Sequence, residues 1–260
     1  MLTYRVDGEG TPLVLTPLVL LNGGMMSIGA WQPFVEPLSA RYRIIRCDFR
    51  GQLLTPGPFA RSFEEHAEDV VEMLNELRIE QAHVLGISYG GEVAMTLAAL
   101  HPERIERLIV ISATDYTADW MRRHAVEGRE LAERAARGEG TGGELFRRVA
   151  ASTWSEAWLA KQPPDFLEQR ARQVGALPPP YFEGMAALLG LLETLDLRPL
   201  LPTVTAPTYV LAGADDRIFP LEHMRAIAAA VHGARLEVVP DTGHGLLMER
   251  ADRVLAALLG

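Results

Sequence analysis

Apolar and polar positions along the chain fall into two alternating patterns. Short apolar runs bounded by polar or glycine residues are typical of buried strands, and they alternate with longer segments whose apolar residues recur at helical spacing. Strands that alternate with helices indicate a mostly parallel central sheet flanked by helices, which is an α/β fold. The predicted strands are 17–21, 43–47, 83–87, 108–111, 208–212 and 236–239, and the predicted helices include 63–77, 91–100 and 221–231.

The first apolar stretch contains a duplication, since residues 11–15 and 16–20 both read Thr-Pro-Leu-Val-Leu. Two copies are too few for a repeat architecture, which stacks units of about 20 residues or more. Pro17 has no N–H to donate to a sheet, so one uninterrupted strand through both copies is not expected. We expect the buried strand at 17–21, with the first copy as an extended or bulged lead-in.

The alternation of strands and helices stops after Ser112. Residues 114–203 show no convincing strand pattern and contain helical stretches rich in Arg, Glu and Ala, with a glycine-rich segment at 138–143. Strand character returns only after this region. The chain therefore divides into a sheet domain, residues 1–113 and 204–260, and a helical insertion between two sheet strands. Such an insertion is expected to lie over the edge where the strands end.

Composition narrows the class of protein. The chain has 260 residues, of which 48% are hydrophobic and 23% charged, so it can bury a sizeable core and is not expected to be disordered. Its formal net charge of −9 argues against a nucleic-acid partner, because such proteins need a dense positive field to neutralise phosphates. The longest apolar stretch, 13–21, is interrupted by Pro17 and is too short to span a membrane. The first residues lack the layout of a signal peptide, so we expect a cytoplasmic protein without membrane contact.

Cysteine content and motifs argue against several cofactors. Cys47 is the only cysteine, which excludes an intramolecular disulfide, and its apolar surroundings predict a buried side chain rather than a catalytic thiol. The sequence has no H-E-x-x-H motif and no Cys/His cluster for a transition metal. Residues 138–143 match G-x-G-x-x-G, but a charged helical segment precedes them where a dinucleotide site needs a strand. We therefore expect no metal and no cofactor.

Residues 84–94 carry the strongest chemical signal. They read Val-Leu-Gly-Ile-Ser-Tyr-Gly-Gly-Glu-Val-Ala, which places G-x-S-x-G between an apolar strand and a helical pattern. In this context a sharp turn raises a serine hydroxyl above the end of a sheet. Gly86 and Gly90 permit the close backbone approach that the turn requires. Ser88 is therefore the predicted nucleophile.

A serine nucleophile needs a base. Among seven histidines, His244 stands out because it lies in a glycine-flanked loop after the last predicted strand. His83 opens a strand and His101 precedes a proline near a helix end. The remaining histidines are predicted to be surface or packing residues of helical segments: His66, His124, His223 and His232.

The base needs an acid that orients it, and three aspartates are candidates. Asp215 and Asp216 follow the strand at 208–212, and Asp115 follows the strand at 108–111. Parallel strands end at the same edge of a sheet, so each carboxylate can reach that edge. The chain order serine, aspartate, histidine is the one expected for a hydrolase with this serine motif.

Together these features resemble the α/β-hydrolase superfamily, and the likeness extends through nearly the whole chain. The resemblance implies that residues 114–203 form a cap over the active site. Family spacing favours Asp216 over Asp215 as the acid. The matching segments are Leu-Leu-Asn-Gly-Gly at 20–24, Cys-Asp-Phe-Arg-Gly at 47–51, Gly-Ile-Ser-Tyr-Gly-Gly at 86–91, Gly-Ala-Asp-Asp-Arg-Ile-Phe-Pro at 213–220 and Thr-Gly-His at 242–244.

The resemblance also implies an oxyanion hole built from backbone N–H groups. Its donors would be Gly24 N–H and Tyr89 N–H, with Met25 as the alternative to the first. Members of the superfamily commonly carry His-Gly where this chain has Asn22-Gly23. This departure need not disable the hole, because the stabilising donors belong to the backbone.

Several large apolar side chains are candidates for a substrate pocket under the cap, although each alone is more typical of a core. They are Met25, Met26, Trp120, Trp154, Trp158, Phe182 and Met185.

These predictions describe a serine hydrolase that cleaves a small carboxylic ester, thioester or lactone through Ser88, His244 and Asp216. Carbon–carbon bond hydrolysis, aminopeptidase activity, acyl transfer, lyase and perhydrolase chemistry stay open on the same three residues. Serine at position 88 disfavours the haloalkane dehalogenase and epoxide hydrolase branches, which use a carboxylate there. A non-catalytic small-molecule-binding protein is the alternative from another class, although a receptor has no need for all three residues. A small-molecule substrate is the only partner that the sequence predicts.

Overall fold

A sheet of seven strands forms the centre of the computed structural model, which describes residues 2–7, 15–53, 55 and 57–260. The strand order is β1-β3-β2-β4-β5-β6-β7, and β1 is antiparallel to β3 while the other pairs are parallel. The predicted α/β fold is therefore confirmed. The strands are β1 (Thr3–Asp7), β2 (Thr16–Leu21), β3 (Tyr42–Asp48), β4 (Ala82–Ile87), β5 (Ile105–Ile111), β6 (Thr208–Gly213) and β7 (Arg235–Val239).

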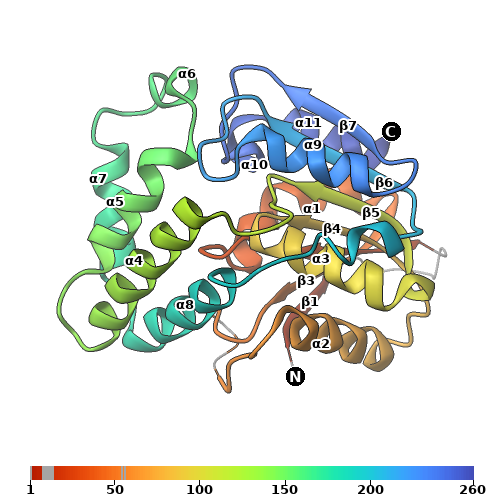
Figure 1. The fold of residues 1–260 in the computed structure, drawn as a ribbon, viewed down its shortest axis with the longest axis horizontal. Helices are drawn as coiled ribbons and strands as arrows, with labels where there is room; N and C mark the ends of the chain where they lie inside the picture. The colour runs from red at the N-terminus through yellow and green to blue at the C-terminus, as the bar shows by residue number, and fades with distance from the viewer. Residues whose placement is uncertain (1, 8–14, 54, 56) are drawn as a thin grey trace.

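Helices cover both faces of the sheet (Figure 1). Successive side chains of a strand point to opposite faces, so on β2 Val19 and Leu21 join one hydrophobic cluster while Leu18 and Leu20 join the other. Helices α2, α3 and α9 contribute to the first cluster, and α1 and α11 to the second. The sheet-flanking helices are α1 (Gln32–Ser39), α2 (Phe63–Glu76), α3 (Tyr89–Leu100), α9 (Leu221–Ala230), α10 (Leu246–Glu249) and α11 (Ala251–Leu259).

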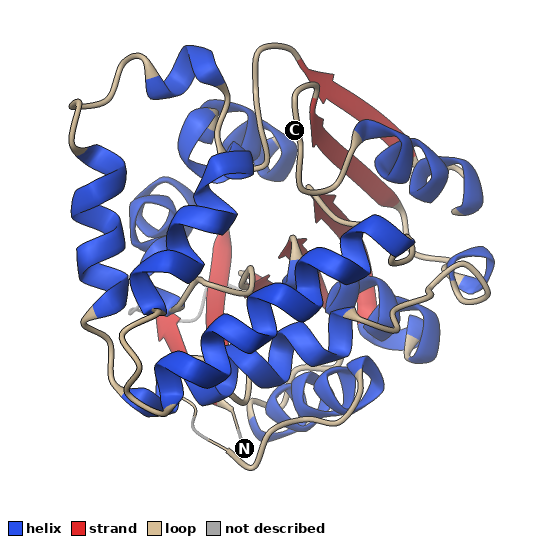
Figure 2. Ribbon diagram, turned by 60° about the vertical axis from the view of Figure 1, so that its left-hand side comes forward, coloured by secondary structure: helices blue, strands red, loops and turns tan. Residues whose placement is uncertain are grey.

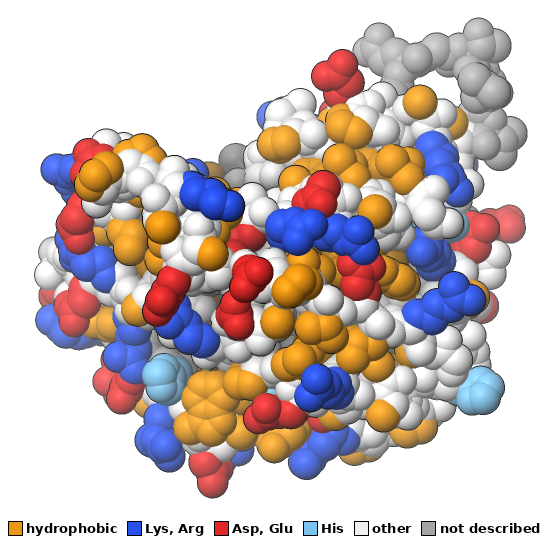
Figure 3. Space-filling view, turned by 90° about the horizontal axis from the view of Figure 1, so that it is seen from above, with side chains coloured by type: hydrophobic (Ala, Val, Ile, Leu, Met, Phe, Trp, Pro, Cys, Tyr) orange, Lys and Arg blue, Asp and Glu red, His pale blue; other side chains and the backbone are white. Residues whose placement is uncertain are grey.

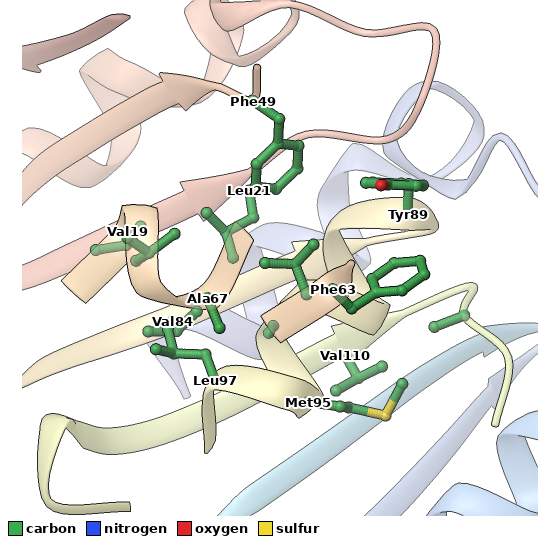
Figure 4. Packing of buried hydrophobic residues seen from close by; sticks show 14 of the residues in the cluster. Val19, Leu21, Phe49, Phe63, Ala67, Val84, Tyr89, Met95, Leu97 and Val110 are labelled. Carbon is green, nitrogen blue, oxygen red and sulfur yellow. The ribbon is translucent and has the colours of Figure 1, made fainter. Parts of the chain in front are cut away.

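Figure 4 shows the first cluster at close range. Leu21 of β2 and Val84 of β4 pack with Ala67 of α2 and Leu97 of α3, and all four side chains are fully buried. Burying a valine or leucine side chain stabilises a fold by about 1.5–3 kcal/mol. The cluster therefore packs α2 and α3 against strands β2 and β4.

The pairing of strand β2 with its two neighbours shows how the sheet accommodates Pro17. It begins at Thr16, one residue before the prediction, and Pro17 is paired with Arg43 of β3, whereas pairing with β4 begins only at Leu18. Because Pro17 has no β4 partner, its missing N–H costs no hydrogen bond on that side. Residues 11–14 of the first repeat copy lie outside the described residues.

Several elements differ from the sequence predictions. The antiparallel edge strand β1 and the helices α1 and α11 were not predicted. Helix α3 begins at Tyr89, two residues before the expected start, because the serine turn leads directly into it. Helix α9 ends at Ala230 rather than at Val231.

Five helices lie between β5 and β6, within the segment where no strand was expected. They stand beside the sheet in Figure 1 and come forward in Figure 2, with α4 packed on α8 and α5 on α7. The glycine-rich segment at 138–143 follows helix α4, not a strand, so it lacks the context of a dinucleotide site. The helices are α4 (Asp119–Ala136), α5 (Gly142–Thr153), α6 (Glu156–Leu159), α7 (Phe166–Gly175) and α8 (Pro179–Leu192).

The two ends of this helical insertion run side by side. A β-bridge joins Tyr116 to Asp196, Thr117 N–H donates to Leu195 O at 2.9 Å, and Leu197 N–H donates to Asp115 O at 2.7 Å. The insertion therefore enters and leaves the sheet domain through one paired connection.

The strand order also locates the place where a ligand site is expected. From β2 the chain continues to β3 on one side of it, and the next strand, β4, lies on the other side. In α/β sheets such a reversal opens a crevice at the carboxyl ends of the strands. The loops after β2 and β4 begin at this point.

Candidate active site

Ser88 occupies the turn between β4 and α3 in a conformation that few non-glycine residues adopt. Its φ is 51° and its ψ is −126°, and its N–H donates to Ile111 O of β5 at 2.9 Å. A positive φ at a residue with a Cβ is strained and persists only where the surrounding structure imposes it. The turn thus holds the serine side chain at the end of the sheet.

Two glycines make this turn possible. A Cβ added to Gly86 would lie 2.0 Å from Gly90 O, and a Cβ added to Gly90 would lie 2.4 Å from Leu21 O. Both distances are shorter than any real contact, so each position requires glycine. The same approach brings the start of α3 against the end of β2.

The structure brings Ser88, His244 and Asp216, the three residues predicted to be catalytic, into one chain of hydrogen bonds. His244 Nε2 lies 2.9 Å from Ser88 Oγ, and His244 Nδ1 lies 2.8 Å from Asp216 Oδ2. An ionised carboxylate can only accept, so the Nδ1 proton lies toward Asp216 and Nε2 is left to accept from the serine hydroxyl. This is the arrangement in which an imidazole can remove the proton of an attacking serine.

The loop after β6 holds the Asp216 carboxylate in place. Its Oδ1 accepts from Ile218 N–H and Phe219 N–H, both at 2.9 Å, and the residue is 7% exposed. Asp215 is exposed to solvent. Asp115, the third candidate, pairs with His223 instead, with 2.6 Å between Oδ1 and Nδ1. The structure therefore brings Asp216, and neither alternative, to His244.

The predicted oxyanion donors come from the loops after the adjacent strands β2 and β4. Gly24 follows β2, and Tyr89 is the first residue of α3. Met26 N–H donates to Gly23 O at 3.1 Å, which makes Gly24 and Met25 the central residues of a turn. A Cβ built on Gly24 would meet no described atom within 4 Å, so space is open beside this residue.

A buried polar network that the sequence analysis missed supports the Gly24 turn. The Asn22 side chain donates to Asp48 Oδ1 at 2.7 Å and to Gln52 Oε1 at 3.0 Å, and it accepts from Trp31 Nε1–H at 2.7 Å. Gln52 Nε2–H in turn donates to Gly23 O at 2.8 Å. Asn22 thus replaces the histidine common at this position and keeps every polar group of its side chain paired.

Buried polar groups also lie behind the serine, on α2 and α3. Burial raises the pKa of the Glu92 carboxyl well above its usual range, and its Oε1 accepts from Thr114 N–H at 2.8 Å. Burial likewise raises the pKa of Tyr89 and lowers that of His66 to about 3. Among the described residues, neither ring nitrogen of His66 nor the Tyr89 hydroxyl has a hydrogen-bond partner. Burial therefore disfavours the charged form of each of these three side chains.

Comparison with known proteins identifies the family. A family model for the alpha/beta hydrolase fold matches residues 16–251. The chain belongs to the α/β hydrolase fold family. The match spans β2 to the start of α11, and so includes every residue of the predicted site.

Relatives of this α/β hydrolase align along its whole length. One from Caulobacter sp. strain K31, named "Putative carbamate hydrolase RutD", is 27% identical, and the alignment covers 100% of this chain and 97% of the relative. A relative of the same name from Azorhizobium caulinodans is 29% identical and is 94% covered.

Solved structures show the same fold. MGS-M2, an α/β hydrolase enzyme from a deep-sea metagenome library of the Medee basin, superimposes with a TM-score of 0.91 at 25% identity, covering 100% of this chain and 93% of that one. The enol-lactonase from Burkholderia xenovorans LB400 gives a TM-score of 0.83 at 28% identity, with 99% and 95% covered.

Only some of the apolar residues expected to line a pocket lie together in the structure of this α/β hydrolase. Met25, next to Gly24, packs against an aromatic cluster of the insertion that includes Trp154 and Trp158, whose rings stack 5.6 Å apart. The other four candidates lie elsewhere. Met26 packs against the second hydrophobic cluster, and Phe182 and Met185 are buried in the first. Trp120 packs on His124.

The remaining sequence predictions concern cofactors, membranes and surface charge. Cys47 is buried, and burial raises the pKa of its thiol. In the described part of the chain, no three His, Cys, Asp or Glu side chains are grouped as metal ligands, and no helix is long and apolar enough to cross a bilayer. On the face in Figure 3, acidic and basic side chains are interspersed with hydrophobic ones.

Proposed function

We propose that this α/β hydrolase is a serine hydrolase that cleaves a small carboxylic ester, thioester or lactone through a covalent acyl-enzyme. The hydrogen-bonded chain from Ser88 Oγ through His244 to Asp216 carries the proposal. The enol-lactonase likeness at 28% identity supports a carbonyl substrate of this kind.

In the proposed mechanism, Ser88 Oγ attacks the carbonyl carbon while its proton passes to His244 Nε2. Gly24 N–H and Tyr89 N–H stabilise the negative charge that develops on the carbonyl oxygen, and a donor of this kind is worth about 10²–10³ in rate. The tetrahedral intermediate collapses as His244 protonates the leaving group. Water, deprotonated by the same imidazole, then hydrolyses the acyl-enzyme and restores Ser88.

We propose that residues 114–203 act as the cap of this site and that the substrate contacts its aromatic side chains. The support is the aromatic cluster around Trp154, against which both Met25, beside the proposed oxyanion donor, and Trp158 pack. Apolar walls with a few polar groups are typical of small-molecule sites, and they favour an uncharged substrate with an apolar portion.

A carbamate is a second candidate substrate. The two relatives from Caulobacter sp. and Azorhizobium caulinodans carry the name "Putative carbamate hydrolase RutD", and each alignment covers 100% of this chain. A carbamate presents the same electrophilic carbonyl to Ser88, with nitrogen in place of one carbon neighbour. The same residues therefore serve either substrate without a new catalytic group.

A substrate panel tests the proposal and separates the candidates. Purified wild type and Ser88→Ala are compared on p-nitrophenyl esters of graded length, lactones, thioesters, carbamates and a diketone. We expect hydrolysis of at least one carbonyl class by the wild type and none above background by Ser88→Ala. Turnover by Ser88→Ala at the wild-type rate contradicts the mechanism, and a folded wild type inert toward every class favours a binding protein instead.

A further inference from the structure

Glu249 holds the His244 loop and the helical insertion together. It ends the short helix α10, five positions after His244. Its carboxylate accepts from Gly243 N–H at 3.1 Å, from Ser155 N–H at 3.2 Å and from the Ser155 hydroxyl at 2.5 Å. One side chain therefore binds both the residue before His244 and the segment between α5 and α6.

The residue after His244 is fixed to the same segment. Gly245 N–H donates to Thr153 O at 2.7 Å. A Cβ on Gly243 would lie 2.8 Å from Thr153 O, and a Cβ on Gly245 would lie 2.4 Å from Cδ1 of the Trp154 ring. Both neighbours of His244 are thus in direct contact with residues 153–155, and α10 lies beside this corner of the insertion in Figure 1.

The acid loop is attached to this corner as well. The guanidinium of Arg217, next to Asp216, donates to Ala151 O at 3.1 Å and to Trp154 O at 3.3 Å. The end of α5 therefore contacts the loops that carry both the base and the acid. Among these contacts, only Glu249 contributes a charged acceptor to the backbone of the His244 loop, and charge-assisted hydrogen bonds are about twice as strong as neutral ones.

We infer that Glu249 is a positioning residue for His244 and that the insertion, through Ser155, is part of the support that aims the imidazole at Ser88. This inference rests on the proposed function, because it assigns the geometry of that site. Glu249 touches no reacting atom. It acts by fixing the backbone at Gly243, so its loss allows the imidazole to move relative to Ser88 Oγ. A displacement of about 1 Å at a catalytic group costs about 100-fold in rate.

The test compares Glu249→Ala, Glu249→Gln and Ser155→Ala with Met248→Ala, a truncation of an exposed neighbour on the same helix. We expect Glu249→Ala to lower kcat by about 10–100-fold with KM changed less than about twofold, because the base is misaligned while the substrate pocket is kept. Glu249→Gln keeps an oxygen for the two N–H donors and restores most of kcat. Met248→Ala is indistinguishable from wild type.

A spectroscopic measurement separates positioning from general stability. The proton between His244 Nδ1 and Asp216 is expected to give a low-field NMR signal that is lost in His244→Ala, and the proton of the His223–Asp115 pair serves as an internal reference. In Glu249→Ala we expect the His244 signal to shift or broaden while the His223 signal is unchanged. An unchanged His244 signal with wild-type kcat overturns the inference.

Two further results keep the outcomes distinct. If Glu249→Ala does not fold, Ser155→Ala serves in its place, because it removes only the hydroxyl contact. We expect Ser155→Ala to lower kcat by a smaller factor than the loss of about 10–100-fold expected for Glu249→Ala. The double variant Ser155→Ala/Glu249→Gln is expected to lose no more kcat than Ser155→Ala alone. Wild-type kcat in Ser155→Ala then overturns the inference. If Ser88→Ala retains activity, the proposed function fails; if Ser88→Ala is inactive but Glu249→Ala is fully active, only the positioning role fails.

Discussion

The carboxylate of Asp115 lies 2.6 Å from Nδ1 of His223, so this aspartate is paired with a histidine other than His244. Both partners are buried, and Thr114 Oγ1 lies 3.0 Å from the same nitrogen. The pair links the start of the insertion to helix α9. The geometry thus pairs Asp115 with His223 and Asp216 with His244.

The first prediction separates these two aspartates. Asp216→Asn is expected to lower kcat by about 10⁴-fold, because an amide no longer holds the imidazole in the productive tautomer. Asp115→Asn is expected to keep kcat within a few-fold and to lower the free energy of unfolding by about 1–3 kcal/mol, through loss of a charge-assisted hydrogen bond. Steady-state kinetics and urea unfolding measure both effects. Equal losses of kcat in the two variants contradict the assignment of the acid.

The second prediction concerns Gln52, whose amide holds Gly23 O and thereby the Gly24 turn. Gln52→Met preserves side-chain volume but removes the donor, and we expect kcat to fall by about 10–100-fold as the Gly24 N–H loses its orientation. A boronic acid that mimics the tetrahedral intermediate should lose affinity by a similar factor, because it uses the same donor. Leu53→Ala, at an exposed neighbour, is the control. Unchanged boronate affinity in Gln52→Met would show that the network does not orient this donor.

The third prediction tests whether Tyr89 contributes only its backbone to the site. Its buried hydroxyl has no partner among the described residues, so Tyr89→Phe removes a desolvation cost without removing a hydrogen bond. We expect kcat within twofold of wild type and a free energy of unfolding that is unchanged or higher by up to about 1 kcal/mol. In the matched variant Tyr42→Phe, the lost hydroxyl donates to Leu258 O at 2.6 Å, and stability should fall by about 1 kcal/mol. A large loss of kcat in Tyr89→Phe alone would assign the hydroxyl a catalytic role.

The fourth prediction follows from the pKa of His66, which burial lowers from 6.5 to about 3. The unfolded chain takes up a proton at His66 below pH 6.5, whereas the folded protein does so only near pH 3. The contribution of neutral His66 to the free energy of unfolding is therefore complete above pH 6.5 and is lost as the pH falls from 6.5 toward 3. The loss is about 1.4 kcal/mol per pH unit across this window. His66→Phe, with a ring that suits the contacts to Phe49 and Tyr89, should show a dependence flatter by this amount between pH 6 and 4 in urea unfolding. The exposed His124→Ala should keep the wild-type slope, and the same slope in His66→Phe would contradict the prediction.

The serine turn was predictable because local sequence dictates it. G-x-S-x-G between a strand and a helix leaves few other conformations, and the glycine contacts at Gly86 and Gly90 show the reason. His244 was recognisable for a similar reason, since its glycine neighbours permit the close packing against residues 153–155. These features depend on the residue and its immediate neighbours.

The choice of the acid was not determined by the residues alone. Asp115 and Asp216 both follow parallel strands, and the partner of each is set by tertiary packing, in which α9 brings His223 to Asp115. The resemblance selected Asp216 by spacing, whereas composition and periodicity left three candidates. His223 was expected to be a surface or packing residue, and its hydrogen bond to Asp115 was not predicted.

Gln52 and Glu249 were missed because their roles appear only across distant contacts. Gln52 bonds to a loop 29 positions earlier, and Glu249 bonds to Ser155 across 94 positions. The signal available in the sequence was weak: a polar residue in a turn after β3, and a carboxylate five residues after the histidine. The pocket prediction failed in part for the same reason. The sequence does not distinguish a core residue such as Phe182 from Met25, because helix packing decides which of the two lies near the site.

Covalent labelling of Ser88 tests the central claim most directly. Wild type and Ser88→Ala are treated with a fluorophosphonate, and the modified peptide is identified by mass spectrometry together with residual esterase activity. The account predicts one phosphonate on Ser88 of the wild type, loss of activity in proportion to labelling, and neither labelling nor activity in Ser88→Ala. A folded wild type that is not labelled at Ser88, or an active Ser88→Ala enzyme, would contradict it.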